Sequence, residues 1–227
     1  MDKINQRVLK HNHEPYQFYD YEYYHELVDS ELNINKEYTG AFRMYHLFGS
    51  HHDMYWDENM WLYDVDNPVQ PLRGSLRIIE EYVDKLEKKG VLDKTTIIVT
   101  ADHGQWAGTQ STEISRVLSN PPNPIMLVKY ADSDMSKPLE ISRAPVSHAD
   151  LFATVIDGCG LDASDYGRTI REIPEDEKRE RYYYFTAYSA ETGAEAELRE
   201  YLIDGDAGSF DNWTYTGNSW DILYSAF

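Results

Sequence analysis

One short segment holds the residues best suited to metal chemistry. Residues 95–101 form an apolar, β-branched run, and Asp102, His103 and Gly104 follow it directly. Such a run is typical of a strand buried in a parallel sheet, and open α/β sheets bind ligands beyond the carboxyl ends of their strands. An Asp oxygen and a His nitrogen together suit Zn²⁺ or Mn²⁺. The segment therefore predicts metal ligands at Asp102 and His103, although a turn with a helix cap explains the same tripeptide.

His51 is a second candidate. Residues 40–48 alternate in polarity and end at Gly49 and Ser50, as a strand running into a loop would. The loop holds His51, which could donate a hydrogen bond to an anion. A capping or solvated histidine is the other interpretation. His46, inside the expected strand, is predicted to pack in the core.

The surrounding pattern alternates between helices and strands. Residues 72–89 carry apolar side chains three or four apart and stop at Gly90, which predicts a helix. Residues 20–32 fit a shorter amphipathic helix, residues 125–130 a buried strand, and residues 148–159 another helix. This order favours an α/β fold with a mixed, mainly parallel sheet flanked by helices.

The last fifty residues or so differ in composition from the rest of the chain. Residues 182–188, 199–203 and 212–216 are rich in aromatic and β-branched residues, so they are expected to be strands. We interpret them as a small C-terminal antiparallel appendage. The predicted organisation is a core over residues 1–174 and packed antiparallel strands over residues 175–227.

Composition narrows the possible partners and environment. Forty acidic and twenty-one basic residues give a formal charge of −19, which disfavours nucleic acid and anionic lipid surfaces. The single cysteine, Cys159, ends an apolar run and is expected to be a packed thiol. No stretch approaches the roughly 20 apolar residues that a membrane-spanning helix needs, so the chain as given is expected to be soluble.

Three segments resemble the alkaline phosphatase superfamily. Residues 92–104 are similar to the second metal-binding motif of sulfatases, lipoteichoic-acid-synthase-like phosphoglycerol transferases and phosphoethanolamine transferases. Residues 44–51 resemble that family's strand and loop ending in a Gly-Ser-His segment. Residues 146–155 look like the family segment that opens a late helix beside the site, where we interpret His148 and Asp150 as structural. The sequence departs from the family pattern at His52, Asp53 and Gln105.

The resemblance implies a set of roles. Asp102 and His103 would hold a divalent metal ion (Zn, Mn, Ca or Mg), and His51 would contact the anionic group of a sulfate or phosphate ester, carried by a glycan or glycolipid. Family members place the nucleophile and an acidic ligand upstream of the segment corresponding to Tyr19. We therefore expect the nucleophile to be absent from this chain, the missing N-terminal portion to belong to a parent protein at the cell envelope or extracellular face, and the isolated chain to be inactive.

A non-enzymatic function is the alternative. Five Trp and nineteen Tyr could supply stacking surfaces for a carbohydrate- or protein-binding module built on the same scaffold. The sequence leaves the oligomeric state, the ester type and the acceptor open.

Overall fold

The structure is a computed structural model and describes residues 18–38, 40–49, 51, 54–62, 69–104, 123–188 and 195–221. The chain divides into two compact units, Met1–Thr95 and Thr96–Phe227. The boundary that we predicted at residue 174 falls inside the second unit and stays a prediction. Ser50, His52, Asp53 and Gln105 lie outside the described residues.

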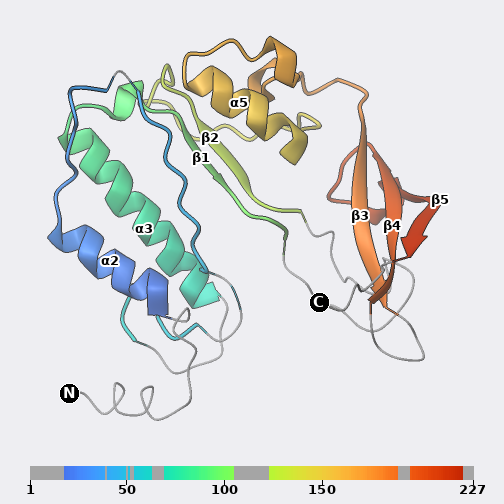
Figure 1. The fold of residues 1–227 in the computed structure, drawn as a ribbon, viewed down its shortest axis with the longest axis horizontal. Helices are drawn as coiled ribbons and strands as arrows, with labels where there is room; N and C mark the ends of the chain where they lie inside the picture. Colours follow the sequence, from blue (N-terminus) through green and yellow to red (C-terminus); the bar gives the residue numbers. More distant parts are fainter. Residues whose placement is uncertain are drawn as a thin grey trace. The chain divides into compact units, whose positions relative to one another are not determined.

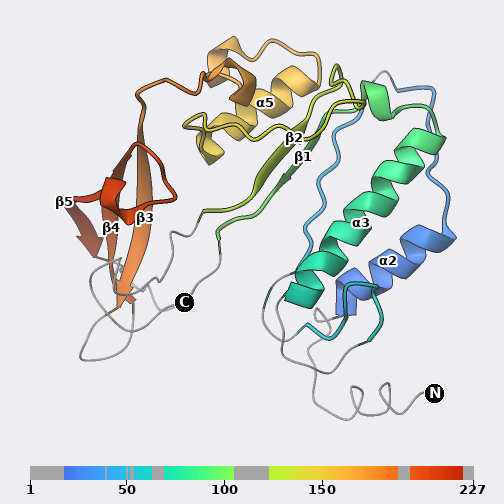
Figure 2. The ribbon, with the colours of Figure 1, turned by 180° about the vertical axis from the view of Figure 1, so that it is seen from behind.

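The first unit is built on two helices, α2 (Tyr19–Asp29) and α3 (Val69–Lys88), which lie side by side in Figures 1 and 2. A short 3-10 helix, η2 (Leu92–Lys94), follows α3. The core contains five buried apolar residues, Leu27, Met54, Trp56, Met60 and Ile78. This core joins α2 to α3 and to residues 54–62.

The helix predicted over residues 72–89 is confirmed as α3. The chain reverses at Gly90 (φ +67°), where Gly90 N donates to Glu87 O at 2.8 Å and Val91 N donates to Leu86 O at 3.1 Å. These two bonds form a Schellman motif. Ser75 and Ile78 are buried, whereas Leu76 is 44% exposed. Leu86, near the end of the helix, is buried as well.

Two predictions for residues 40–48 were wrong. The segment forms no strand, and His46 is exposed rather than packed in the core. Aromatic side chains attach the segment to the two helices instead. The Tyr45 hydroxyl donates to the Tyr82 hydroxyl of α3 at 3.3 Å, and the centre of the Phe48 ring lies 6.1 Å from that of Tyr19 in α2. Alternating polarity favours an extended backbone but does not supply a partner strand.

The second unit begins with a two-stranded sheet, β1 (Ile97–Thr100) and β2 (Met126–Lys129), seen in Figure 1. The strands are antiparallel, with Ile97 opposite Lys129 and Thr100 opposite Met126. β1 is half-buried, not buried on both faces. A short apolar run predicts a strand, but its periodicity carries no information on the direction of its neighbour. The mainly parallel sheet that we predicted is not shown by the described strands.

A helical segment follows β2. The short helix η3 (His148–Asp150) leads into α5 (Leu151–Gly158), which confirms the helix predicted over residues 148–159. Ser147 and Asp150 form a capping box at its start. Two further 3-10 helices are η4 (Ser164–Tyr166) and η5 (Ile170–Glu172). Cys159 is exposed, so the prediction of a packed thiol was wrong. The thiol lies just beyond the last residue of α5, where the chain turns toward solvent.

The predicted C-terminal strands form a three-stranded antiparallel sheet in the order β3 (Glu180–Tyr188), β4 (Glu195–Asp204), β5 (Trp213–Asp221), visible at the red end of the colour scale in Figures 1 and 2. A 3-10 helix, η6 (Phe210–Asn212), precedes β5. One face of the sheet is a small core of Phe185, Tyr201, Ile203 and Trp213. Within the described residues, no helix is long and apolar enough to cross a membrane.

Candidate functional site

Asp102 and His103 follow β1 after a single residue, Ala101. The structure brings the two side chains together, since His103 Nε2 lies 3.6 Å from Asp102 Oδ2. Asp102 Oδ1 also accepts a hydrogen bond from His103 N at 2.9 Å. The end of the strand therefore presents one carboxylate oxygen and one imidazole nitrogen toward each other.

The orientation of the His103 ring is set by the backbone. His103 Nδ1 lies 2.6 Å from Gly104 O, and a carbonyl oxygen can only accept, so Nδ1 carries a proton in this contact. In the neutral ring, Nε2 is then the acceptor nitrogen. Both side chains are accessible, with exposures of 83% for Asp102 and 48% for His103. A histidine that binds a metal through one ring nitrogen commonly donates the other N–H to a carbonyl in this way.

The two residues that we interpreted as structural lie in η3. Asp150 is 3% exposed and binds the guanidinium of Arg179 through both oxygens, which agrees with that interpretation. His148 is exposed, and its Nε2 lies 3.3 Å from Thr100 Oγ1 at the end of β1. This contact ties η3 to the strand that carries Asp102 and His103.

His51 belongs to the first unit, where it ends a tight turn. His51 N donates to Phe48 O at 2.8 Å, and the residue is exposed. Gly49, inside the turn, has a φ of +31°. The turn therefore presents His51 at the surface of the first unit.

Sequence reasoning missed Asp20, in the first turn of α2. It is 2% exposed, and its carboxylate accepts hydrogen bonds from Gly49 N at 2.7 Å and from Phe48 N at 3.2 Å. Burial raises the pKa of Asp20, and the two amides act in the opposite direction. An acidic residue in a first helical turn is usually an exposed partner of the helix dipole, so its sequence position gave no sign of this contact.

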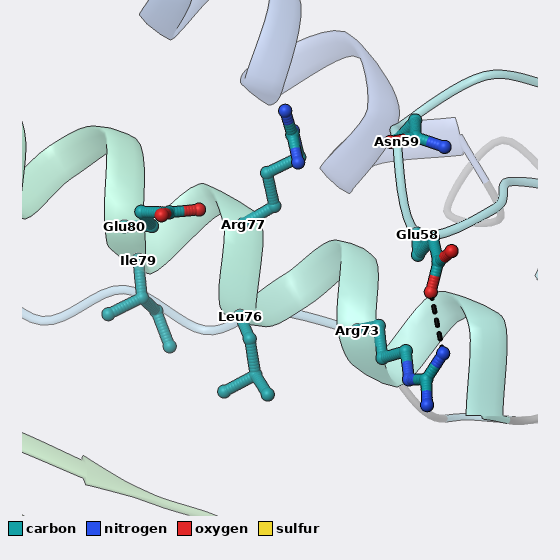
Figure 3. A pocket seen from close by; sticks show the side chains of 7 residues that line it. All are labelled: Glu58, Asn59, Arg73, Leu76, Arg77, Ile79 and Glu80. Atoms are coloured by element: carbon teal, nitrogen blue, oxygen red, sulfur yellow. Dashed lines mark hydrogen bonds and ion pairs between the residues drawn. The ribbon is translucent and has the colours of Figure 1, made fainter.

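An open depression on the first unit contains none of the predicted site residues. It is lined by Glu58, Asn59, Arg73, Leu76, Arg77, Ile79 and Glu80. Figure 3 shows Leu76 and Ile79 on one side of α3 and Arg77 on the other. Arg73 is paired with Glu58 at 2.7 Å, and Arg77 Nε donates to the Tyr24 hydroxyl at 3.3 Å. Its arginines are thus already engaged within the unit, and the depression gives no reason to expect an anion there.

The described part of the chain contains no group of three or more His, Cys, Asp or Glu side chains arranged to hold a metal ion. Asp102 and His103 fit a divalent metal by donor type, but two donors fall short of the roughly four that a tight site needs. They therefore form at most part of a coordination shell.

Comparison with known proteins identifies the family. The sulfatase family model matches residues 6–161, roughly two thirds of the chain, including both the Asp102–His103 pair and His51. The chain belongs to the sulfatase family, and this membership indicates an enzyme that acts on sulfate or phosphate esters, generally with a divalent metal. No curated protein and no solved structure matched the chain.

Proposed function

We propose that this chain supplies part of the metal and substrate site of a sulfatase-family enzyme that cleaves or transfers a sulfate or phosphate ester group. The observation that carries the proposal is the Asp102–His103 pair after β1, in which Nδ1 of His103 lies against Gly104 O. In this proposal Asp102 offers a carboxylate oxygen and His103 a ring nitrogen as metal ligands.

The donor set favours Zn²⁺ or Mn²⁺ over Ca²⁺ or Mg²⁺, because the latter two prefer oxygen ligands. A bound metal ion would act as a Lewis acid toward an oxygen of the ester. Asp102 and His103 would hold it, and the remaining donors would come from outside the described residues. His51 would donate a hydrogen bond to an oxygen of the substrate anion and stabilise negative charge that develops there.

The attacking nucleophile is assigned to no residue of this chain. A covalent mechanism needs an activated hydroxyl or a comparable group next to the metal. We therefore expect the isolated chain to bind metal weakly and to turn over no ester. Glycans and glycolipids are the substrate carriers that we propose, with the enzyme at the cell envelope or extracellular face.

Calorimetric titration with Zn²⁺ and with Mn²⁺ tests this function. The wild-type chain is compared with an Asp102→Ala/His103→Ala double variant and with a Glu140→Ala control, which removes one exposed carboxylate elsewhere in the second unit. Phosphatase and arylsulfatase assays are run on the same samples. The proposal expects weak binding that the double variant loses and the control keeps, without turnover. Metal binding that survives in the double variant would overturn the assignment of Asp102 and His103.

The C-terminal sheet favours a second candidate, a carbohydrate-binding surface. Tyr182, Tyr184 and Trp220 are each about half exposed, and the Tyr184 and Trp220 rings lie 6.1 Å apart. Exposed aromatic rings can stack on the apolar faces of sugars. A sugar-dependent change in tryptophan fluorescence that is independent of metal and lost in Trp220→Ala would favour this candidate. An unchanged spectrum over a panel of glycans would rule it out.

A further inference from the structure

The His51 turn is attached to a buried carboxylate. Asp20 Oδ2 accepts from Gly49 N at 2.7 Å and Oδ1 accepts from Phe48 N at 3.2 Å. The same turn closes through the bond from His51 N to Phe48 O at 2.8 Å. Asp20 thus binds Phe48 and Gly49, at the start of the turn that the His51 amide closes.

A second element restrains the turn from the α3 side. A Cβ atom placed on Gly49 would meet Ser75 Oγ at 2.4 Å, so the Gly49 backbone lies against α3. Ser75 is itself fixed, because its hydroxyl donates to Pro71 O at 3.0 Å within the helix. The turn is therefore held between a carboxylate at the start of α2 and a serine in α3.

A carboxylate is chemically required for this arrangement. Asp20 uses one oxygen for each amide, and both amides are donors. An Asn side chain of the same shape would present one oxygen and one NH₂ group, so its NH₂ would face one of the two N–H donors. Asp is almost never fully buried unless paired. Burial raises the pKa of Asp20, so keeping a carboxylate here has a free-energy cost that the hydrogen bonds from the turn offset in part.

We infer that Asp20 is a positioning residue for His51: it fixes the turn that presents the His51 ring to the sulfate or phosphate group of the substrate. The inference rests on the proposed function in one respect, the anion contact of His51. The alternative is that Asp20 only anchors α2 in the first unit.

Nuclear magnetic resonance on the full chain separates these possibilities. Asp20→Asn is compared with Glu22→Gln, a matched control that removes a charge from the same first turn of α2 at an exposed position. The readouts are the backbone heteronuclear NOE of His51 and the shift of its ring Cε1 proton during titration with inorganic sulfate and phosphate. Melting temperature and far-ultraviolet circular dichroism report whether each variant is folded.

We expect Asp20→Asn to lower the His51 NOE. We also expect the anion affinity obtained from the His51 ring titration to fall on the order of tenfold, because a charge-assisted hydrogen bond is lost. Glu22→Gln should match the wild type. A folded Asp20→Asn variant with a wild-type NOE and an anion response within about twofold of wild type would overturn the inference.

Two further outcomes remain decisive. If Asp20→Asn does not fold, the wild-type chain is used to measure the scalar coupling between Gly49 ¹⁵N and Asp20 ¹³Cγ across their hydrogen bond. If this coupling is absent and the His51 amide is mobile, the inference is overturned. If the wild-type His51 ring does not respond to either anion, the proposed anion contact fails. The NOE comparison then still decides whether Asp20 fixes the turn.

Discussion

The guanidinium of Arg179 donates to both carboxylate oxygens of Asp150, with each N–O distance at 2.7 Å. The Asp150 side chain is 4% exposed and that of Arg179 is 24% exposed, so the pair is largely removed from water. Ser147 N also donates to Asp150, at 2.8 Å. The pair connects the start of β3 to the helical segment that contacts the end of β1.

Arg179→Met is expected to lower the free energy of unfolding of the second unit by about 3–5 kcal/mol, because it leaves a buried carboxylate without its cation. Urea denaturation followed by circular dichroism measures the change. Arg168→Met removes the exposed pair with Glu177 and should have a much smaller effect. Equal losses in the two variants would contradict the assigned importance of the buried pair.

Gly74→Ala should destabilise the first unit. A Cβ at this position would lie 2.7 Å from Met60 Sδ, 2.8 Å from Trp56 Cδ1 and 3.0 Å from Asp57 O. Overpacking costs about 1–3 kcal/mol, and the helix propensity of Ala returns up to about 1 kcal/mol, so a net loss is expected. Urea unfolding, followed by tryptophan fluorescence, to which the buried Trp56 contributes, measures it.

Gly40→Ala is the matched control for this prediction, because a Cβ there meets nothing within 4 Å. The control should change the free energy of unfolding by less than about 0.5 kcal/mol. A Gly74→Ala variant as stable as the control would show that α3 does not approach residues 56–60 as closely as described.

The Glu172 carboxyl should titrate at a lower pH than an exposed glutamate. Thr169 N donates to Glu172 Oε2 at 2.7 Å and the Thr169 hydroxyl at 2.9 Å, and these bonds lower the pKa of Glu172. Because the pKa of Glu172 is lower in the folded chain, its ionisation stabilises the fold at any pH above the unfolded-state pKa of about 4.3. This stabilisation is lost as the pH falls through the folded-state pKa.

The Glu172 titration is followed by its ¹³Cδ shift. Thr169→Val removes the hydroxyl donor but keeps the backbone donor, so the midpoint should move part of the way toward the ordinary value. A midpoint that does not change, or that moves to lower pH, would contradict the capping geometry.

Cys159 should react with a thiol reagent in the folded chain. The residue is exposed at the end of α5. Labelling with Ellman's reagent is expected to be complete without denaturant and to leave the circular dichroism spectrum unchanged. Cys159→Ser should alter the free energy of unfolding by less than about 0.5 kcal/mol. Labelling that requires urea would restore the earlier expectation of a packed thiol.

The sequence alone determined the features that depend on neighbouring residues. Apolar spacing and Gly90 were sufficient to predict α3 and its end, and the β-branched run was sufficient to predict β1 and to place Asp102 and His103 directly after it. The three C-terminal strands were also predicted. Helix periodicity, helix termination and the residues that follow a strand are local properties of the chain, so they can be read from short windows.

Only the tertiary structure decided which distant groups meet. Asp20 and Gly49 are twenty-nine residues apart, and so are Asp150 and Arg179. No periodic pattern encodes either pair, and both acidic residues occupy helix starts, where exposed carboxylates are common. The same reason explains the errors at β1, β2 and residues 40–48: a run of residues favours an extended backbone, but the identity and direction of its partner are set by the path of the whole chain.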